Sequence, residues 1–341
     1  MRLGWFLAFV LALNIAPAKG QSVRKLAPTG VFYLLKSNSV EHPFENLESD
    51  PSWTNRHVQG VSMRSQWSKI EPSEGDFDWA FFDEGVRLAT LHNKKISISV
   101  TAGVTTPDWV YAAGAYKLTI SKLHSSGLQE QPLPWDSIFL SKWSSFVRAL
   151  AARYDNIPNL AYVVMGGPGR RAESFFVTAP EEVAHFESLG GLSRWVQGSE
   201  KIIDCYGSAF QKTPFILALG APVPTDAGRA ALRQLVGYGA SHYSGRFGVM
   251  SDGLRPRYAM RSPVAQMIRE LSNRSPVGFQ MLLPSKGGRQ MPEGSLADAL
   301  NGGVALGGHF FEVYSGDCND PNQANVLQEV GAKLMAKFGN D

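Results

Sequence analysis

Cysteine and histidine are scarce in this chain of 341 residues, and their spacing fits no metal site. The two cysteines and seven histidines are scattered, and no Cys-x-x-Cys pair occurs. Neither a zinc centre nor a dithiol redox motif is therefore predicted, and no metal or cofactor is expected. The sequence leaves open whether Cys205 and Cys318 form a disulfide or remain separate thiols.

Motifs of several common enzyme classes are also absent. The glycine-rich residues 166–171, GGPGRR, form neither a dinucleotide fingerprint nor a P-loop. No Gly-x-Ser-x-Gly sequence occurs, which argues against the catalytic triad of an α/β-hydrolase. The formal net charge is only +3 and no block of basic residues stands out, so a nucleic-acid partner is not expected.

Long apolar runs are confined to the start of the chain. Residues 3–15 are apolar, Arg2 precedes them, and residues 16–18, Ala-Pro-Ala, fit the cleavage site of a secretory signal. The run is too short to span a membrane. We expect residues 1–20 to be a signal peptide, residues 21–341 to be one catalytic domain, and the protein to be secreted or periplasmic.

The sequence does contain a regular alternation of short apolar strands and amphipathic helices. Eight strand-like runs begin near residues 30, 60, 95, 160, 214, 247, 277 and 307, and five of the seven spacings are 30 to 35 residues. No sequence repeat accompanies this pitch, which argues against a solenoid. The pattern predicts an α/β fold, a single-domain (β/α)8 TIM barrel, with a patternless insert at residues 112–135.

Three acidic residues fall near the carboxyl ends of predicted strands, where TIM-barrel enzymes carry out their chemistry. Glu173 follows the fourth strand and a glycine-rich turn, Asp252 follows the sixth strand, and Glu312 lies in the eighth. Glycoside hydrolysis usually needs one carboxyl group to donate a proton and another to attack or to activate water. We predict Glu173 as the general acid and Glu312 as the nucleophile or base.

Each of these assignments has a structural alternative. Glu173 can be a solvated loop residue. Glu312 lies in the apolar run HFFEVY, and because an unpaired buried carboxylate is costly, it can be an internal ion-pair partner of Arg64. Asp252, in Ser-Asp-Gly, either holds a sugar hydroxyl or caps a turn.

Aromatic side chains are plentiful, with 8 Trp, 10 Tyr and 19 Phe. Trp67 and Trp109 follow the second and third predicted strands, and Tyr314 ends the eighth, so these rings are candidates for stacking on a sugar. Core packing is the alternative for each of them. Arg64, near the end of the second strand, is a candidate for a polar contact with the substrate.

Two segments resemble a known family. Residues 67–83, WSKIEPSEGDFDWAFFD, are similar to the W-x-x-I/L-E-P-x-x-G-x-Y/F-D-W/F segment of glycoside hydrolase family 42 β-galactosidases and related clan A barrels. Residues 106–110, TPDWV, resemble the Pro-x-Trp that follows strand three in those enzymes. The resemblance implies a retaining hydrolase with its acid/base glutamate after strand four, where Glu173 lies, and its nucleophile glutamate at the end of strand seven.

The chain departs from this family pattern at two positions. Ala172 stands where the clan usually has asparagine, and Gln280 stands at the strand-seven position. Because an amide cannot be the nucleophile, either the strand count is off, or Glu312 takes that role, or the protein lacks standard retaining chemistry. Gln280 would then bind the sugar, and a wider separation of the carboxyl groups would favour inversion.

These observations predict a secreted, β-galactosidase-like glycoside hydrolase that acts on an oligosaccharide or polysaccharide. The alternative is a non-catalytic carbohydrate-binding TIM barrel, and the amide at Gln280 is the feature that favours it.

Overall fold

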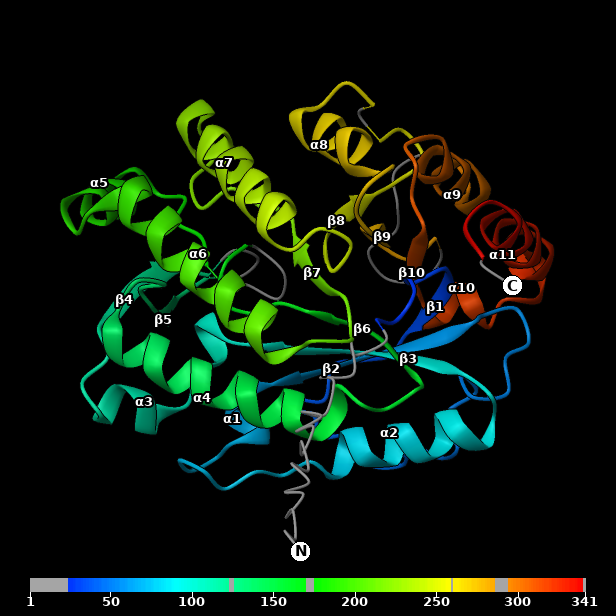
Figure 1. The fold of residues 1–341 in the computed structure, drawn as a ribbon, viewed down its shortest axis with the longest axis horizontal. Coiled ribbons are helices and arrows are strands. Elements are labelled where there is room, and N and C mark those ends of the chain that lie inside the picture. The colour runs from blue at the N-terminus through cyan, green and yellow to red at the C-terminus, as the bar shows by residue number, and fades with distance from the viewer. Residues whose placement is uncertain (1–23, 123–125, 170–174, 259, 286–293, 340–341) are drawn as a thin grey trace, which may run out of the picture.

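A computed structural model describes residues 24–122, 126–169, 175–258, 260–285 and 294–339. The strands of one closed barrel lie at the centre of the molecule (Figure 1), and they number eight. They are β1 (Gly30–Leu34), β2 (Gly60–Gln66), β3 (Lys95–Thr101), β6 (Leu160–Val164), β7 (Phe215–Ala218), β8 (Phe247–Leu254), β9 (Val277–Met281) and β10 (Phe310–Tyr314). They close into a barrel in the order β1-β10-β9-β8-β7-β6-β3-β2, which confirms the predicted (β/α)8 TIM barrel.

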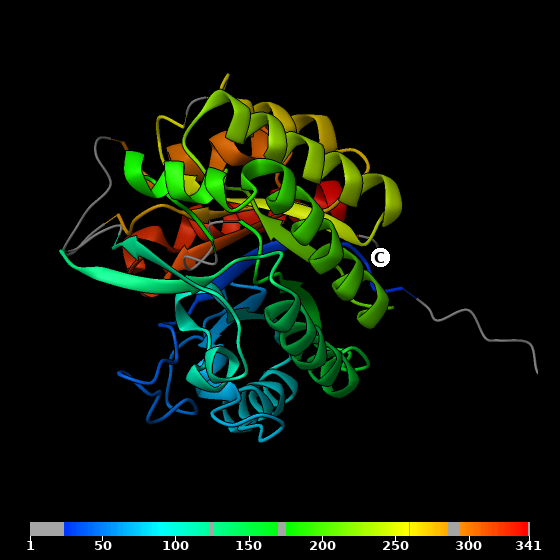
Figure 2. The ribbon, with the colours of Figure 1, turned by 90° about the vertical axis from the view of Figure 1, so that its left-hand side faces the viewer.

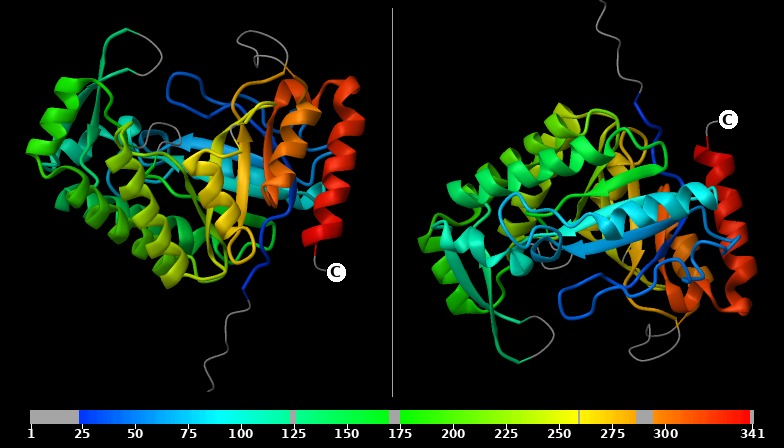
Figure 3. Two further views of the ribbon diagram at one scale, coloured as in Figure 1. Left: turned by 90° about the horizontal axis from the view of Figure 1, so that it is seen from above. Right: turned by 90° about the horizontal axis from the view of Figure 1, so that it is seen from below.

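Helices surround the barrel on its outside (Figures 1 and 3). The longer ones are α2 (Ala80–Leu91), α4 (Ser137–Tyr154), α6 (Gly191–Ala209), α7 (Asp226–His242), α8 (Pro263–Leu271), α9 (Leu296–Ala305) and α11 (Ala324–Phe338). Shorter elements are α1 (Trp67–Ile70), α3 (Asp108–Ala112), α5 (Pro180–Ser188), α10 (Ser315–Cys318) and the 3-10 turns η1 (Gly103–Thr105) and η3 (Pro321–Gln323). Helix α11 packs against β1, so the last helix covers the first strand.

Local sequence explains where several elements begin. Helix α4 starts after Asp136, whose side chain accepts hydrogen bonds from the backbone N–H groups of Ile138 and Phe139, as a good N-cap does. Strand β10 begins at Phe310, slightly later than expected. Gly307 has a φ of 93°, a left-handed conformation that interrupts an extended strand.

The insert before α4 is more regular than the sequence analysis predicted. Strands β4 (Lys117–Ser121) and β5 (Leu128–Pro132) pair as an antiparallel hairpin, which extends away from the barrel (Figure 2). Leu118 and Ile120 are buried on one face of this hairpin. This short alternation of apolar and polar residues is the strand signal that the prediction of a patternless insert missed.

The interior of the barrel has its own small apolar cluster, separate from the larger core that contacts the helices. Its members are Phe32, Tyr162, Val164, Ile216, Ala218, Met250 and Phe310. Because side chains alternate along a strand, the inward position of Phe310 places Glu312 and Tyr314 on the inner face of β10 as well.

Two further findings concern the cysteines and the membrane. Cys205 in α6 and Cys318 in α10 are free thiols, so the disulfide alternative does not hold in this structure. Among the helices that the structure describes, none is long and apolar enough to cross a bilayer. Residues 1–20 lie outside the described residues, and the signal peptide remains a prediction.

Candidate active site

Glu312 is the acidic residue at the centre of the candidate site. It lies inside the barrel, two residues before the carboxyl end of β10, and has no exposed surface. Its Oε1 accepts hydrogen bonds from Ser62 Oγ at 2.8 Å and from Tyr162 Oη at 2.7 Å. Hydroxyl donors match a carboxylate, which as an ion only accepts hydrogen bonds.

The two donors come from distant strands. Ser62 lies on β2, and Tyr162 lies on β6, which is four strands from β10 in either direction around the barrel. Tyr162 therefore reaches Glu312 from the opposite side of the interior. The ring of Tyr162 packs against Phe32 and Phe310, with centroid distances of 5.1 and 4.5 Å, and these contacts direct its hydroxyl toward the carboxylate.

Gln280 lies beside Glu312 on the inner face of the barrel. The two residues are register partners on β9 and β10, and β9 is the seventh barrel strand in chain order. The strand count is therefore confirmed, and an amide occupies the strand-seven position. Gln280 is 7% exposed, and its side-chain oxygen is buried with no hydrogen-bond partner in the described part of the chain. A buried acceptor of this kind gains free energy from a ligand that donates to it.

Three other predicted sugar ligands lie at the same end of the barrel. Arg64 is two residues after Ser62 on β2, is half-buried, and donates from Nη2 to the carbonyl of Leu35 at 3.4 Å. Asp252 is half-buried on β8. Tyr314 ends β10, and its hydroxyl donates to a backbone carbonyl on the neighbouring chain segment. The fold thus brings Arg64, Asp252 and Tyr314 to the barrel end that holds Glu312 and Gln280.

Trp67 does not occupy the position that stacking on a sugar requires. It has no exposed surface, and its ring lies 4.8 Å from that of Trp143 and 5.7 Å from that of Trp109. Its Nε1 donates to Glu71 Oε2 at 2.7 Å, and burial raises the pKa of the Glu71 carboxyl. A ring enclosed in this way offers no face to a ligand, so the prediction for Trp67 is corrected to core packing.

Trp109 is placed differently from Trp67. Its indole N–H donates to the backbone carbonyl of Glu71 at 3.0 Å, and the side chain is only half-buried, at the start of α3. Part of the Trp109 side chain is therefore exposed and available to a ligand, and Trp109 remains a candidate for the sugar contact.

Glu173 lies outside the described residues, together with the neighbouring residues 170–172, so its role as general acid stays a prediction. The turn before it is described. Gly167 and Gly169 have φ values of 104° and 83°, which disfavour any residue with a side chain. A Cβ on Gly169 would lie 2.4 Å from the carbonyl oxygen of Ala218 at the end of β7. This close approach keeps the turn against the carboxyl end of the barrel.

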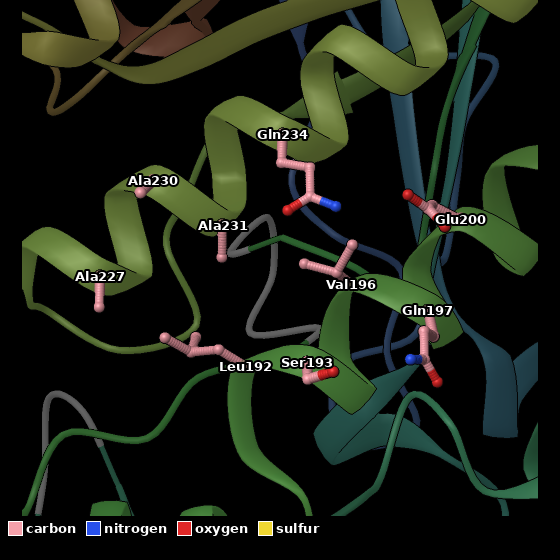
Figure 4. A pocket seen from close by; sticks show the side chains of 9 residues that line it. All are labelled: Leu192, Ser193, Val196, Gln197, Glu200, Ala227, Ala230, Ala231 and Gln234. Carbon is pink, nitrogen blue, oxygen red and sulfur yellow. The ribbon is translucent and has the colours of Figure 1, made fainter.

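Two surface grooves of the described structure lie elsewhere. A groove of about 440 Å³ runs between α6 and α7, and Val196, Glu200 and Gln234 are among the side chains that line it (Figure 4). Another, of about 330 Å³, includes Trp135 and Lys201. Neither contains a predicted site residue. The described residues also contain no group of three or more His, Cys, Asp or Glu side chains that could hold a metal ion.

Comparison with known proteins confirms the family resemblance over part of the chain. Residues 46–167 match the family model of glycoside hydrolase family 42, described as β-galactosidase. Over 108 residues the chain is 34% identical to β-galactosidase BgaB of Geobacillus sp. (strain Y412MC61) and to β-galactosidase bgaB of Geobacillus kaustophilus. These matches cover 30% of this chain and 16% of each relative. The family match includes Arg64 and Trp109 and ends before Gln280 and Glu312.

Solved structures extend the likeness to the whole barrel. The β-galactosidase of the psychrophilic Marinomonas ef1 aligns with a TM-score of 0.57 at 11% identity, over 91% of this chain and 61% of that one. The catalytic domain of the β-amylase of Paenibacillus polymyxa gives 0.56 at 12% identity, over 92% and 99%. The polyextremophilic β-galactosidase of Halorubrum lacusprofundi gives 0.55 at 12% identity, over 89% and 58%. At these identities the likeness shows the fold alone.

The class that the fold defines is therefore the closed (β/α)8 barrel. Within that class, residues 46–167 are related to the family 42 β-galactosidases.

Proposed function

We propose that this protein is a β-galactosidase-like glycoside hydrolase, which uses two of its carboxyl groups to cleave the O-glycosidic bonds of an oligosaccharide or polysaccharide. The observation that carries the proposal is the placement of Glu312, which lies inside a barrel of this class near its carboxyl end and is held at Oε1 by Ser62 and Tyr162. Export of the protein belongs to the same proposal and rests on the signal-like pattern of residues 1–20.

In the proposed reaction, Glu173 protonates the glycosidic oxygen as the bond to the anomeric carbon breaks. Glu312 takes a proton from a water molecule, and the resulting hydroxyl attacks that carbon from the other face. Strand seven carries an amide and the carboxylate stands on β10, opposite β6. Because an amide stands at the strand-seven position of the retaining nucleophile, the proposed reaction is the inverting one, in which the carboxyl groups lie roughly 6.5–9.5 Å apart rather than the 5–5.5 Å of retaining enzymes.

The remaining side chains of the site would orient the sugar. The buried acceptor of Gln280 suits a sugar hydroxyl, and the half-buried ring of Trp109 suits a sugar face. Arg64, Asp252 and Tyr314 complete the proposed set of ligands.

The decisive experiment compares the hydrolysis of aryl glycosides, β-galactosides first, by wild type, Glu173→Gln and Glu312→Gln. Glu71→Gln serves as the control, because Glu71 is a buried glutamate outside the barrel interior. We expect both site variants to lose activity by about 10³-fold or more while the control keeps it. NMR detection of the first anomer released distinguishes inversion from retention. Unchanged hydrolysis by Glu312→Gln would rule out the role of this carboxylate.

A non-catalytic carbohydrate-binding barrel is the second candidate function. Two observations favour it: the amide of Gln280 on strand seven and the complete burial of Glu312, which obliges a sugar to displace the side chains that cover the carboxylate. This candidate predicts that wild type binds a galactoside or a glycan in calorimetry and cleaves none of the panel.

A further inference from the structure

We infer that Tyr162 is a positioning residue, whose phenol holds the Glu312 carboxylate in its working orientation from across the barrel. The inference rests on the proposed function, and it assigns a role to a residue that neither the family pattern nor the sequence analysis singles out.

The first step concerns how Glu312 is held. A glutamate side chain has three rotatable bonds, and a carboxylate without partners can turn among several orientations. Here both Ser62 and Tyr162 donate to the same oxygen, Oε1. Two donors that converge on one oxygen from different strands fix the position of that oxygen and restrict the orientations of the carboxylate.

The second step concerns why Tyr162 can act over this distance. It starts from β6, opposite β10, and its long rigid side chain spans the interior. Tyr162 has no exposed surface, and Phe32 and Phe310 pack on it at interplanar angles of 73° and 39°. The phenol is therefore confined before any ligand arrives, and its hydrogen bond orders Glu312 without a further loss of side-chain entropy.

The third step concerns the position of the carboxylate in the barrel. Phe32 and Gln280 are the register partners of Glu312 on the two neighbouring strands. The donors to Oε1 come instead from β2 and β6, where Ser62 and Tyr162 lie. Misplacing a catalytic group by about 1 Å can lower a rate by about 10²-fold.

The test is the kinetic comparison of Tyr162→Phe with a matched control, Tyr154→Phe. Tyr154 is also buried and also donates to a carboxylate, Asp83 Oδ1 at 2.8 Å, but it lies in α4 outside the barrel. We expect Tyr162→Phe to lower kcat by about 10- to 100-fold with KM within about twofold of wild type. Tyr154→Phe should leave both constants unchanged, even where it lowers the melting temperature.

A second variant, Ser62→Ala, keeps the inference testable if Tyr162→Phe folds poorly, and a double mutant tests whether Tyr162 acts through Glu312. Ser62→Ala removes the other donor to Oε1, so it should lower kcat in the same way and again spare KM. In a Glu312→Gln background, Tyr162→Phe should cause no further loss of residual activity, because residues that act as a unit are not additive.

The outcomes separate this inference from the function on which it rests. If wild type hydrolyses the substrate and Tyr162→Phe keeps a kcat within about twofold of wild type, the positioning role is overturned and the proposed hydrolase function is retained. If Tyr154→Phe loses as much kcat as Tyr162→Phe, the effect is a general one of packing, and the positioning role of Tyr162 is likewise overturned. A wild type that cleaves nothing overturns the proposed function, and the positioning role with it.

Discussion

Tyr162 and Glu312 are 150 positions apart in the sequence, and their side chains meet at 2.7 Å in the middle of the barrel. The interior of the barrel has an apolar and a polar part. The apolar part is the cluster that includes Phe32, Ile216 and Met250. The polar part includes Glu312 and its register partner Gln280. Tyr162 belongs to both parts, because its ring packs in the apolar part and its hydroxyl donates a hydrogen bond to Glu312 in the polar part.

Replacing Gln280 by glutamate distinguishes the two candidate functions. The new carboxylate would stand beside Glu312 on the neighbouring strand, and like charges on facing positions repel. If Glu312 is catalytic, Gln280→Glu should lower kcat by about 10-fold or more and lower the melting temperature. If the protein is a binding barrel that lacks a nucleophile, the same change should create hydrolysis in an inactive protein. Gln280→Met, similar in size and uncharged, is the control.

Trp67 should matter for stability. It is fully buried among aromatic rings, and its indole N–H donates a hydrogen bond to the carboxylate of the buried Glu71. Trp67→Ala should destabilise the protein by about 3–5 kcal/mol, as deletion of a large buried ring does. Urea unfolding measures this loss. Trp109→Ala, at a half-buried ring, should cost clearly less, and an equal cost for the two variants would contradict the difference in burial between the two rings.

Asp155 should stabilise the opposite, amino-terminal end of the barrel. It is 7% exposed, and its carboxylate accepts hydrogen bonds from the backbone N–H groups of Gln211, Lys212 and Thr213. Asp155→Ala leaves these donors without an acceptor and should cost about 2–4 kcal/mol in the free energy of unfolding. Asp226→Ala, on the surface at the start of α7, is the control and should change stability by less than about 0.5 kcal/mol.

His309 should make the fold sensitive to acid. Its Nδ1 accepts a hydrogen bond from the N–H of Val277 at 2.9 Å, and burial, with a smaller effect from Lys337, lowers the pKa of His309 from 6.5 to about 4. The folded protein disfavours the protonated ring. The contribution of neutral His309 to the free energy of unfolding is therefore complete above pH 6.5 and falls progressively between pH 6.5 and 4. The pKa shift corresponds to a loss of roughly 3 kcal/mol in that free energy.

Unfolding in urea at pH 7 and at pH 4.5 measures this effect. His309→Asn keeps an acceptor for the Val277 N–H but carries no titrating ring, so it isolates the histidine from the carboxyl groups that also titrate in this range. Wild type should lose more stability than His309→Asn between the two pH values, and equal losses would show that the histidine is not responsible.

The order of elements could be predicted from the sequence because it depends on local pattern. Apolar runs at a pitch near 30 residues are sufficient to indicate alternating strands and helices, and the presence of eight such units predicts a closed barrel. The same reasoning located Gln280 on the seventh strand and Glu312 on the eighth, since a position within a strand follows from counting. The hairpin in the insert was missed because five-residue strands with mixed polarity carry a weak signal.

The partners of the site could not be predicted in the same way. Nothing near Tyr162 in the sequence indicates a polar role, and its run Leu160–Val164 resembles any buried strand. Trp67 gives no sign in the sequence that four other rings cover it. Closure of the barrel decides both cases, because it brings β6 opposite β10 and folds α4 over α1. Local periodicity determines which face of an element is buried, whereas the residue that meets that face is determined by how distant strands and helices pack together.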